Sequence, residues 1–494
     1  MKVAYGKMGV AADHPIAVKI GLDVLESGGN AFDAAIAVSA ALSVLQPQSG
    51  GLGGDAFMLF LREGEVKAYA SNGRSFSGFD PERFIEEKPK RGPLTATVPG
   101  LAALWEKVSE ELTSFPLGDL LQPSISLAQN GFYASYMLSS ASISAEKELS
   151  RYRWTQYYRG IMPGDIVRNT EMARTLKIIS QRGPRDFYEG KLAEEVLEQL
   201  RQQGVEAEEE DLKKHHAEEV RTLKLEVEGK ELYEFPPSTH GATTLHLISA
   251  LHELGLDRMQ FADPNRIDEW REPIRIAYEF RDNFIGDPEF MNVDLGKMLR
   301  YSDIRGLSAG SSRGGGGSDT TFFIVSDGEN LVGFIQSLFN PFGSGLIIGG
   351  FPLQNRGLGF ATRKGIPNSP APRKRPLHTL SILGINEEKA KRIIGCVGGD
   401  VRPQLHLRAY ENIYVYNMKD HAALISPRFI FTSYTGEQVV EVEEPLPMPE
   451  SRKYRALRVP LYGTHGYLHL AKIDERGVLS LASDPRTEGI AVAL

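Results

Sequence analysis

A run of glycines stands directly before a rigid apolar segment in GGGGSDTTFFIVSDGENLVGFIQSLF, which begins at Gly314. The apolar part predicts two strands joined by the turn SDGEN. If the glycines are only a linker, β-propensity alone explains the threonine that opens the first strand. A second interpretation is self-cleavage, because a threonine freed as a new N-terminus carries its own base, the α-amine. Glycines would let the preceding peptide bond distort so that the hydroxyl reaches its carbonyl. Both interpretations stay open at this point.

The composition is that of a large globular protein. The 494 residues are 41% hydrophobic and 24% charged, which allows an extensive core. The net charge is −8 and no block of lysine or arginine stands out, so we expect no nucleic-acid partner. Cys396 is the only cysteine, which excludes an intramolecular disulfide and a cysteine-based metal site. The N-terminal segment lacks the apolar stretch of a secretory signal, and no apolar run approaches the roughly 20 residues of a membrane helix. We therefore expect a cytoplasmic protein without a membrane partner.

Helical and hairpin patterns alternate along the chain. Residues 14–47 predict two helices around a Gly-Gly break, with Asn30 capping the second helix and Asp33 completing a capping box. The further predicted elements are, in chain order, strands at 56–74, helices at 99–200 and 244–284, and strands at 390–400 and 467–484. This alternation predicts an α+β fold in which helices cover antiparallel sheets.

Two stretches are expected on the surface for their polarity. Residues 205–232 are strongly charged, which predicts a solvated lobe, and VEEPLPMPE at 442–450 is rich in proline and acid.

Most familiar cofactor and catalytic motifs are missing from the sequence. GLGGDA, from Gly51 to Ala56, formally fits a dinucleotide fingerprint, but a hairpin follows it where a helix would have to hold the pyrophosphate. A glycine loop near a site is the better interpretation. The eleven histidines form no HExxH motif, and neither GxSxG nor a P-loop occurs. We therefore expect no metal and no organic cofactor.

Six segments together resemble the gamma-glutamyltranspeptidase family of N-terminal-nucleophile hydrolases, in the family's order and over nearly the whole chain. They are GGNAFDAAIAVSAALSVLQPQSGGLGGDAFML, TVPGLAALWEKV, AYEFRDNFIGDP, DTTFFIVSDGENLVGFIQSLFNPFGSG, RKRPLHTLS and GCVGGDVRPQ. The resemblance implies a zymogen that cuts itself between Asp319 and Thr320. It also implies a four-layer αββα core that the fragments 1–319 and 320–494 build together and keep after the cut.

The resemblance assigns roles to five residues. Thr320 matches the nucleophile, and Ser337 matches a threonine whose hydroxyl supports it. Gly398 and Gly399 match the pair whose N–H groups form the oxyanion hole, which needs close approach without a Cβ. Arg74 matches the arginine that binds the substrate's α-carboxylate, a natural role for a bidentate guanidinium.

The sequence departs from the family pattern where a substrate ammonium would bind. Gly359 stands in place of an acid, and Phe339 in place of an asparagine. A buried ammonium without an acid partner is costly, which puts glutathione in doubt as a substrate. Arg356 could even repel an ammonium. The predicted substrate-binding residues besides Arg74 are Asn340, Arg356, His378 and Thr379, the last two standing where the family has two serines.

Three functions follow from these residues and the resemblance. The first is an autoprocessed gamma-glutamyltransferase or glutathione hydrolase-like enzyme that hydrolyses or transfers a gamma-glutamyl-type acyl group through an acyl-Thr320 intermediate. The second is an acylase for glutaryl-type dicarboxylic monoamides, and the third is an unprocessed, inactive scaffold or binding protein. The expected partners are a small amide substrate and the chain's own two fragments, with a homo-oligomer possible.

Overall fold

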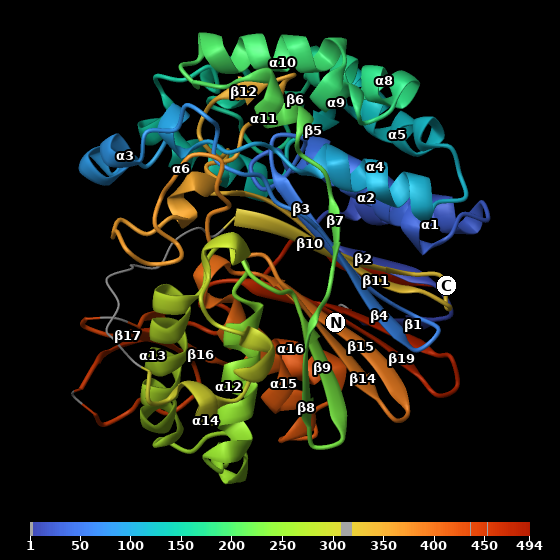
Figure 1. Ribbon diagram of the computed structural model, residues 1–494. Coiled ribbons are helices and arrows are strands. Elements are labelled where there is room, and N and C mark those ends of the chain that lie inside the picture. The colour runs from blue at the N-terminus through green and yellow to red at the C-terminus, as the bar shows by residue number, and fades with distance from the viewer. Residues whose placement is uncertain (1–2, 308–318, 435, 452) are drawn as a thin grey trace.

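Two stacked β-sheets form the centre of the molecule, and each sheet carries a layer of helices on its outer side (Figure 1). The computed structural model describes residues 3–307, 319–434, 436–451 and 453–494. Neighbouring strands in both sheets are antiparallel. This arrangement confirms the predicted α+β, four-layer αββα architecture.

Each central sheet has seven strands in the described part of the chain. In spatial order, the first sheet consists of β21 (Ile490–Ala493), β2 (Gly9–Ala12), β10 (Asp319–Ser326), β11 (Leu331–Phe339), β3 (Asp55–Arg62), β4 (Glu65–Ser71) and β7 (Glu218–Val220). The second consists of β1 (Val3–Gly6), β20 (Leu479–Ser483), β19 (Tyr467–Asp474), β15 (Ala390–Val397), β14 (Ile382–Glu387), β9 (Lys230–Glu234) and β8 (Leu223–Val227). Smaller sheets pair β5 (Phe132–Tyr133) with β6 (Ile166–Val167), β12 (Ile347–Ile348) with β13 (Phe351–Pro352), and β16 (Phe429–Ser433) with β17 (Val439–Glu443) and β18 (Arg455–Val459).

The helices divide between the two outer layers (Figure 1). On the side of the first sheet lie α1 (Pro15–Glu26), α2 (Ala31–Leu45), α3 (Pro81–Glu87), α4 (Leu101–Glu111), α5 (Leu117–Asn130), α6 (Tyr136–Leu149), α7 (Thr155–Tyr158), α8 (Thr170–Arg182), α9 (Asp186–Glu189), α10 (Lys191–Gln202) and α11 (Glu209–Lys213). On the side of the second lie α12 (Gly241–Glu253), α13 (Arg266–Phe284), α14 (Tyr301–Ile304), α15 (Arg402–Tyr414) and α16 (Asp420–Ile425). All of the helices that the structure describes are too short or too polar to span a bilayer.

Strand β10 shows how the layers are held together. Phe322 and Ile324 belong to the apolar cluster between the sheets, whereas Phe323 and Val325 belong to the cluster beneath the first helix layer. Alternate side chains of one strand therefore bury apolar area on both faces. Helix α2, rich in alanine and buried along its whole length, packs on β10 and β11. Its predicted capping box is present.

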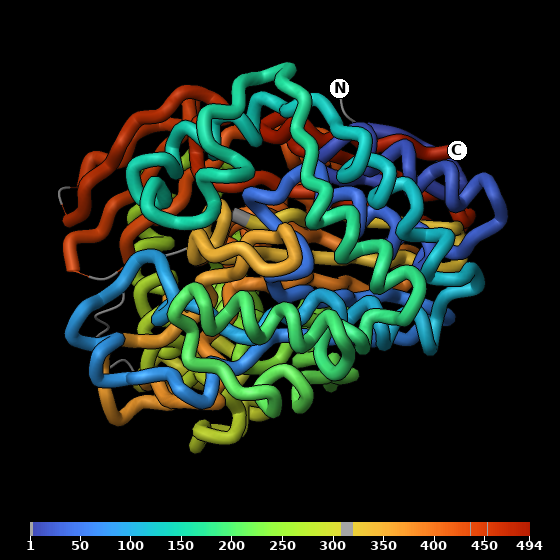
Figure 2. The backbone as a smooth tube through the Cα atoms, turned by 90° about the horizontal axis from the view of Figure 1, so that it is seen from above, coloured from blue at the N-terminus to red at the C-terminus, as the bar shows by residue number. Residues whose placement is uncertain are grey.

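Segments before and after residue 319 alternate within the sheets. In the first sheet, β10 and β11 lie between β2 and β3; in the second, β14, β15, β19 and β20 lie between β1 and β9. The ends of the chain lie close together (Figure 2), where Lys7 N–H donates to the Leu494 carbonyl at 2.6 Å. Both halves of the sequence thus contribute to one continuous core.

The prediction of a solvated lobe at 205–232 is wrong. This stretch supplies β7 to the first sheet and β8 with part of β9 to the second, so it crosses from one sheet to the other. In β8, buried Leu223, Leu225 and Val227 alternate with exposed charged residues. That period of two is a strand signal which the high overall charge concealed.

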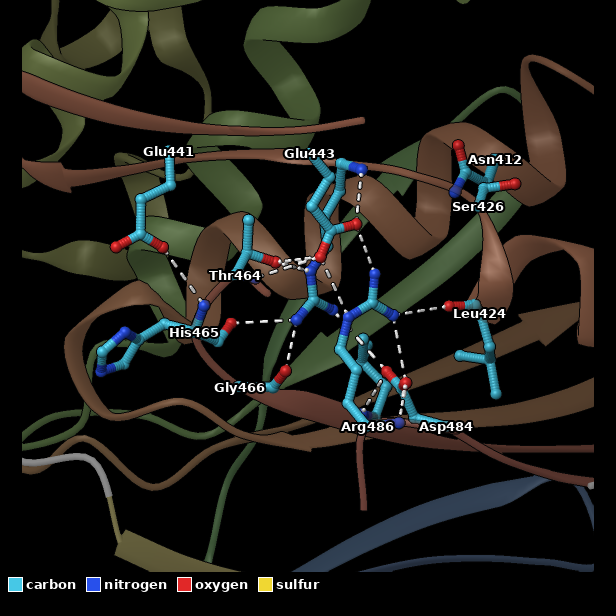
Figure 3. A network of polar contacts seen from close by, with 12 residues as sticks. Asn412, Leu424, Ser426, Glu441, Glu443, Thr464, His465, Gly466, Asp484 and Arg486 are labelled. Atoms are coloured by element: carbon cyan, nitrogen blue, oxygen red, sulfur yellow. Dashed lines mark hydrogen bonds and ion pairs between the residues drawn. The ribbon is translucent and has the colours of Figure 1, made fainter. Parts of the chain in front are cut away.

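The predicted surface excursion at 442–450 is also partly wrong. Glu443 ends β17 and is fully buried. It accepts hydrogen bonds from Arg486 at 2.6 Å and from the Thr464 hydroxyl at 2.7 Å (Figure 3). The buried acid is stable there because a guanidinium and a hydroxyl satisfy both oxygens.

Candidate active site

The candidate site lies where strand ends from both sheets meet. Thr320 is at the start of β10 and Ser337 near the end of β11. β15 ends at Val397, directly before Gly398 and Gly399. The two regions are brought together by Gly395, where an added Cβ would lie 2.2 Å from the ring of Phe322. Without a side chain, Gly395 lets that ring lie against β15, so the start of β10 with Thr320 and the glycine pair share one edge of the sandwich.

Thr320 and Ser337 form a buried hydroxyl pair. Thr320 Oγ1 donates to Ser337 Oγ at 3.2 Å, and both side chains are at most 2% exposed. The β10–β11 register shifts between Asp319 and Thr321, because Asp319 pairs with Phe339 whereas Thr321 pairs with Gln336. Such irregularities re-aim side chains near active sites. The candidate scissile bond, between Asp319 and Thr320, lies inside this irregular step.

Arg356 joins this pair from a separate loop. Its guanidinium donates to Ser337 Oγ at 3.2 Å and to Thr379 Oγ1 at 3.1 Å, and it stacks over the Phe339 ring with 4.6 Å to the centroid. The side chain is fully buried. The structure therefore brings the predicted residues Thr320, Ser337, Arg356 and Thr379 into one hydrogen-bonded chain.

Asp55 is a member of the site that was not singled out from the sequence. It opens β3, is fully buried, and is the strand partner of Ser337. Oδ1 accepts from Gly73 N–H at 3.0 Å and from Gln354 Nε2 at 2.8 Å. Burial raises the pKa of Asp55 to about 7, although the nearby Arg356 charge and both hydrogen bonds oppose the rise. The signal for Asp55 was its place in GLGGDA, the glycine loop expected near a site.

That glycine loop does border the site. An added Cβ on Gly54 would lie 2.5 Å from the Ser337 carbonyl oxygen, and one on Gly53 would lie 2.0 Å from that of Pro352. Only glycine permits backbone segments to approach so closely. The expectation of a glycine loop beside a functional site, rather than a nucleotide fingerprint, is consistent with this packing.

His378 reaches the site through Asp55. Its Nδ1 accepts from Leu380 N–H at 3.2 Å, which leaves Nε2 as the protonated nitrogen that donates to Asp55 Oδ2 at 3.0 Å. Burial holds the pKa of His378 well below its usual range, and the positive charge of Arg356 lowers it further. A neutral ring of this kind orients Asp55 and the neighbouring Thr379.

Gly398 and Gly399 form the turn between β15 and helix α15. Gly399 has φ +51°, a conformation that favours glycine, and an added Cβ on Gly398 would lie 2.5 Å from Leu405 Cδ1. The turn is tied to the site by Arg402, whose Nε donates to the Thr379 carbonyl at 2.5 Å. Backbone N–H groups before a helix N-terminus carry partial positive charge, which suits an oxyanion.

Arg74 is linked to the site but engaged elsewhere. Its neighbour Gly73 bonds to Asp55, while the guanidinium pairs with Asp287 at 3.1 Å and with Glu289 at 2.5 Å. Arg74 lines a cavity of about 370 Å³, and Thr320 is not among the residues that line it. Arg74 thus forms ion pairs with two carboxylates of the chain itself, and its binding of a substrate carboxylate stays a prediction.

The remaining predicted positions border the same loop. Asn340 is half-buried, and its N–H donates to Asn355 Oδ1 at 3.1 Å, one residue before Arg356. At Gly359, an added Cβ would lie 2.3 Å from the Leu377 carbonyl oxygen. The space that an acid would need at position 359 is therefore filled by backbone.

Asp400, which follows the glycine pair, is engaged within the chain. It is buried, pairs with Arg281 at 3.2 Å, and lies 3.4 Å from the Tyr434 hydroxyl. Over the described ranges, no three His, Cys, Asp or Glu side chains gather as ligands for a metal ion.

Comparison with known proteins agrees with this geometry. A family model described as Gamma-glutamyltranspeptidase matches residues 17–494. The chain belongs to the gamma-glutamyltranspeptidase family. A relative in Bacillus subtilis, the glutathione hydrolase-like YwrD proenzyme, is 32% identical over 99% of this chain and 98% of its own. The oxamate amidohydrolase proenzyme of Klebsiella pneumoniae is 29% identical over 86% of this chain and 85% of its own.

A solved structure has the same fold along the whole chain. The cephalosporin acylase from Bacillus halodurans superposes with a TM-score of 0.89 at 26% identity, covering 100% of this chain and 97% of that chain. The resemblance stated from the sequence motifs, and the N-terminal-nucleophile hydrolase fold that it implied, are thereby confirmed.

Proposed function

We propose that the protein is an autoprocessed amidohydrolase or acyltransferase that works through an acyl-Thr320 intermediate. The observation that carries the proposal is the 3.2 Å contact between Thr320 and Ser337 at an irregular step of β10, in a chain of this family. Self-cleavage and turnover then use the same hydroxyl.

Maturation follows from the position of Thr320. Its Oγ attacks the carbonyl carbon of residue 319, the C–N bond breaks, and the proton passes to the Thr320 nitrogen. Water then hydrolyses the resulting ester. The products are residues 1–319, ending in a carboxylate, and residues 320–494, beginning with a free amine. The interleaved strands hold the two fragments together.

Turnover repeats this chemistry on a small amide. Thr320 Oγ attacks the amide carbonyl carbon while the Thr320 amine takes the hydroxyl proton. N–H groups of Gly398 and Gly399 stabilise the oxyanion, and Ser337 orients the nucleophile. The protonated amine donates to the leaving nitrogen as the C–N bond breaks. Water, or an acceptor amine, then releases the acyl group and frees Thr320.

A gamma-glutamyl-type acyl group is the first candidate substrate, in line with the family. A dicarboxylic monoamide is the second, and it is favoured by one observation: the backbone of Leu377 fills the space of an ammonium-binding acid at Gly359. The relative named oxamate amidohydrolase supports an amide without an α-ammonium, because oxamate carries only an amide and a carboxylate.

A denaturing gel and an anilide assay test the proposal. With one cysteine, no disulfide can join the fragments, so processing gives bands of about 35 and about 19 kDa, scaled from 54.6 kDa by residue count. N-terminal sequencing of the smaller band should begin at Thr320. A single band at full mass together with no hydrolysis of any gamma-glutamyl or glutaryl anilide would instead support the inactive scaffold.

A further inference from the structure

Arg356 is the buried cation that stands nearest to the nucleophile in the hydrogen-bonded chain. Two consecutive hydrogen bonds of 3.2 Å join Thr320 Oγ1 to Arg356 Nη2 through Ser337 Oγ. These two atoms are therefore within roughly 6–7 Å of each other. Any acyl group attacked by Thr320 must lie within a few bond lengths of this guanidinium.

The guanidinium is held in place before substrate arrives. The two preceding residues are anchored, because Gln354 Nε2 donates to Asp55 Oδ1 at 2.8 Å and Asn355 N–H donates to the Leu338 carbonyl at 3.1 Å. The Phe339 ring supports the planar group from one side. A receptor fixed in this way loses little conformational entropy on binding.

Burial makes the charge of Arg356 effective over this distance. The side chain is fully buried, and charges interact more strongly in such surroundings than in water. A carboxylate would be attracted and an ammonium repelled. Asp55, the buried acid of the same network, already accepts from Gly73, Gln354 and His378.

The neighbouring positions favour an anion without an ammonium. Arg356 and Gly359 share one short 3-10 helix, Arg356–Gly359, and at Gly359 the Leu377 carbonyl leaves no room for an acid. Arg74, the other predicted carboxylate receptor, is already paired with Asp287 and Glu289.

We infer that Arg356 receives the distal carboxylate of the acyl group and makes the enzyme selective for short dicarboxylic monoamides that lack an α-ammonium. The inference rests on the proposed function and names its substrate class. The acyl carbon lies about 1.4 Å from the Oγ that binds it, and a carboxylate carbon about 3.5 Å from the nitrogen that donates to it, so the roughly 6–7 Å between Thr320 and Arg356 fits a diacid of two or three carbons, or a glutaryl group in a bent conformation. A gamma-glutamyl group differs from it only by the ammonium.

Three anilides of equal length test the charge selection on the mature, processed enzyme: glutaryl, gamma-glutamyl, and the neutral carboxamide analogue of glutaryl. We expect kcat/KM for glutaryl to exceed that for the carboxamide analogue by roughly 10- to 150-fold, the range of a charged hydrogen bond. Glutaryl should also equal or exceed gamma-glutamyl. In Arg356→Gln the ratio of kcat/KM for glutaryl to that for the carboxamide should fall below about threefold, whatever the absolute rates of the variant. The matched control Arg476→Gln, at an exposed arginine, should keep the wild-type ratios.

If Arg356→Gln fails to mature, inhibition of the wild-type enzyme tests the same charge selection. Glutarate, butyrate and 4-aminobutyrate share the same chain and differ only in an anionic, neutral or cationic end. We expect glutarate to inhibit best and 4-aminobutyrate worst.

Two results overturn the inference, and they differ from each other. Equal losses on all three anilides in Arg356→Gln, or equal inhibition by the three acids, would leave the amidase but remove Arg356 as its charge selector. Hydrolysis of none of the anilides by the wild-type enzyme would overturn the proposed function itself, and the inference with it.

Discussion

Asp55 on β3 and Ser337 on β11 are direct partners across neighbouring strands. Because Ser337 also contacts Thr320 and Arg356, this pairing places a buried carboxyl group beside the hydrogen-bonded chain that contains Thr320. Asp55 in turn holds Gly73, Gln354 and His378, so it joins four separate segments of the chain at one point.

The raised pKa of Asp55 predicts a pH-dependent stability. Its value of about 7 in the folded state lies above the roughly 3.9 of an unfolded aspartate. Between these two pKa values the folded chain binds a proton that the unfolded chain has released. The resulting contribution to the free energy of unfolding is fully present below about pH 4 and is lost as the pH rises through about 7. Within that window the free energy of unfolding falls by up to about 1.4 kcal/mol per pH unit.

Thermal unfolding at several pH values checks this. In the Thr320→Ala background, in which we expect the chain to stay uncut, Tm of the Asp55 protein minus Tm of Asp55→Asn should fall steadily between pH 5 and pH 7. The same substitution at exposed Asp23 serves as the control. A difference that does not change with pH would show that Asp55 is ionised throughout.

Thr320→Ala should abolish both self-cleavage and turnover, because one hydroxyl serves both reactions. Thr320→Ser keeps the hydroxyl and should still mature. The measurement is the appearance of two fragments on a denaturing gel and anilide hydrolysis by the same samples. If Thr320→Ala still yields two fragments, the nucleophile lies elsewhere.

Arg74→Ala tests the rival receptor: if Arg74, and not Arg356, receives the substrate carboxylate, KM for a carboxylate-bearing substrate should rise by roughly 10- to 100-fold. Maturation should slow far less, since no substrate carboxylate takes part in it. A carboxylate that binds Arg74 must displace Glu289, whose side chain is 63% exposed. Glu289→Gln should therefore lower KM. Unchanged steady-state kinetics in both variants would remove Arg74 from the substrate site.

Gly359→Ala should destabilise the chain by about 1–3 kcal/mol, the usual cost of overpacking. Its Cβ would meet the Leu377 carbonyl oxygen at 2.3 Å. Gly306→Ala is the matched control, because nothing lies within 4 Å of an added Cβ there. Equal Tm values for the two variants would mean that the 356–377 loop moves enough to make room for the added methyl group. In that case Gly359→Asp could restore an ammonium site.

Much of the fold follows from local patterns. The capping box at Asn30, the hairpins β3–β4 and β10–β11 and the helices α12 and α13 were all predicted, because each depends on neighbouring residues. The sequence analysis missed the strands β7 and β8, because their high charge concealed a short alternation of apolar residues. Such short strands form only through their pairing with neighbouring strands of the sheet.

The sequence predicted those site residues that the family resemblance or the glycine loop indicated. Thr320, Ser337, Arg356 and Thr379, all named from the sequence, lie together in the structure, and their roles stay predictions. The role of Asp55 was hidden, because its partners Ser337, Gln354 and His378 are about 300 residues away in sequence. The engagement of Arg74 by Asp287 and Glu289 was hidden for the same reason.

The interleaving of strands from both sides of residue 319 has a kinetic consequence. The uncut chain folds in a unimolecular reaction, with β10 and β11 delivered between β2 and β3 by covalent connection. After the proposed cut, the same assembly would require a bimolecular encounter between two chains that each lack three or four of the seven strands of each central sheet. Heat-denatured mature enzyme should therefore recover poorly and in a concentration-dependent way, whereas uncut Thr320→Ala refolds independently of concentration. Cleavage would thus turn a reversible fold into one that can be made only once.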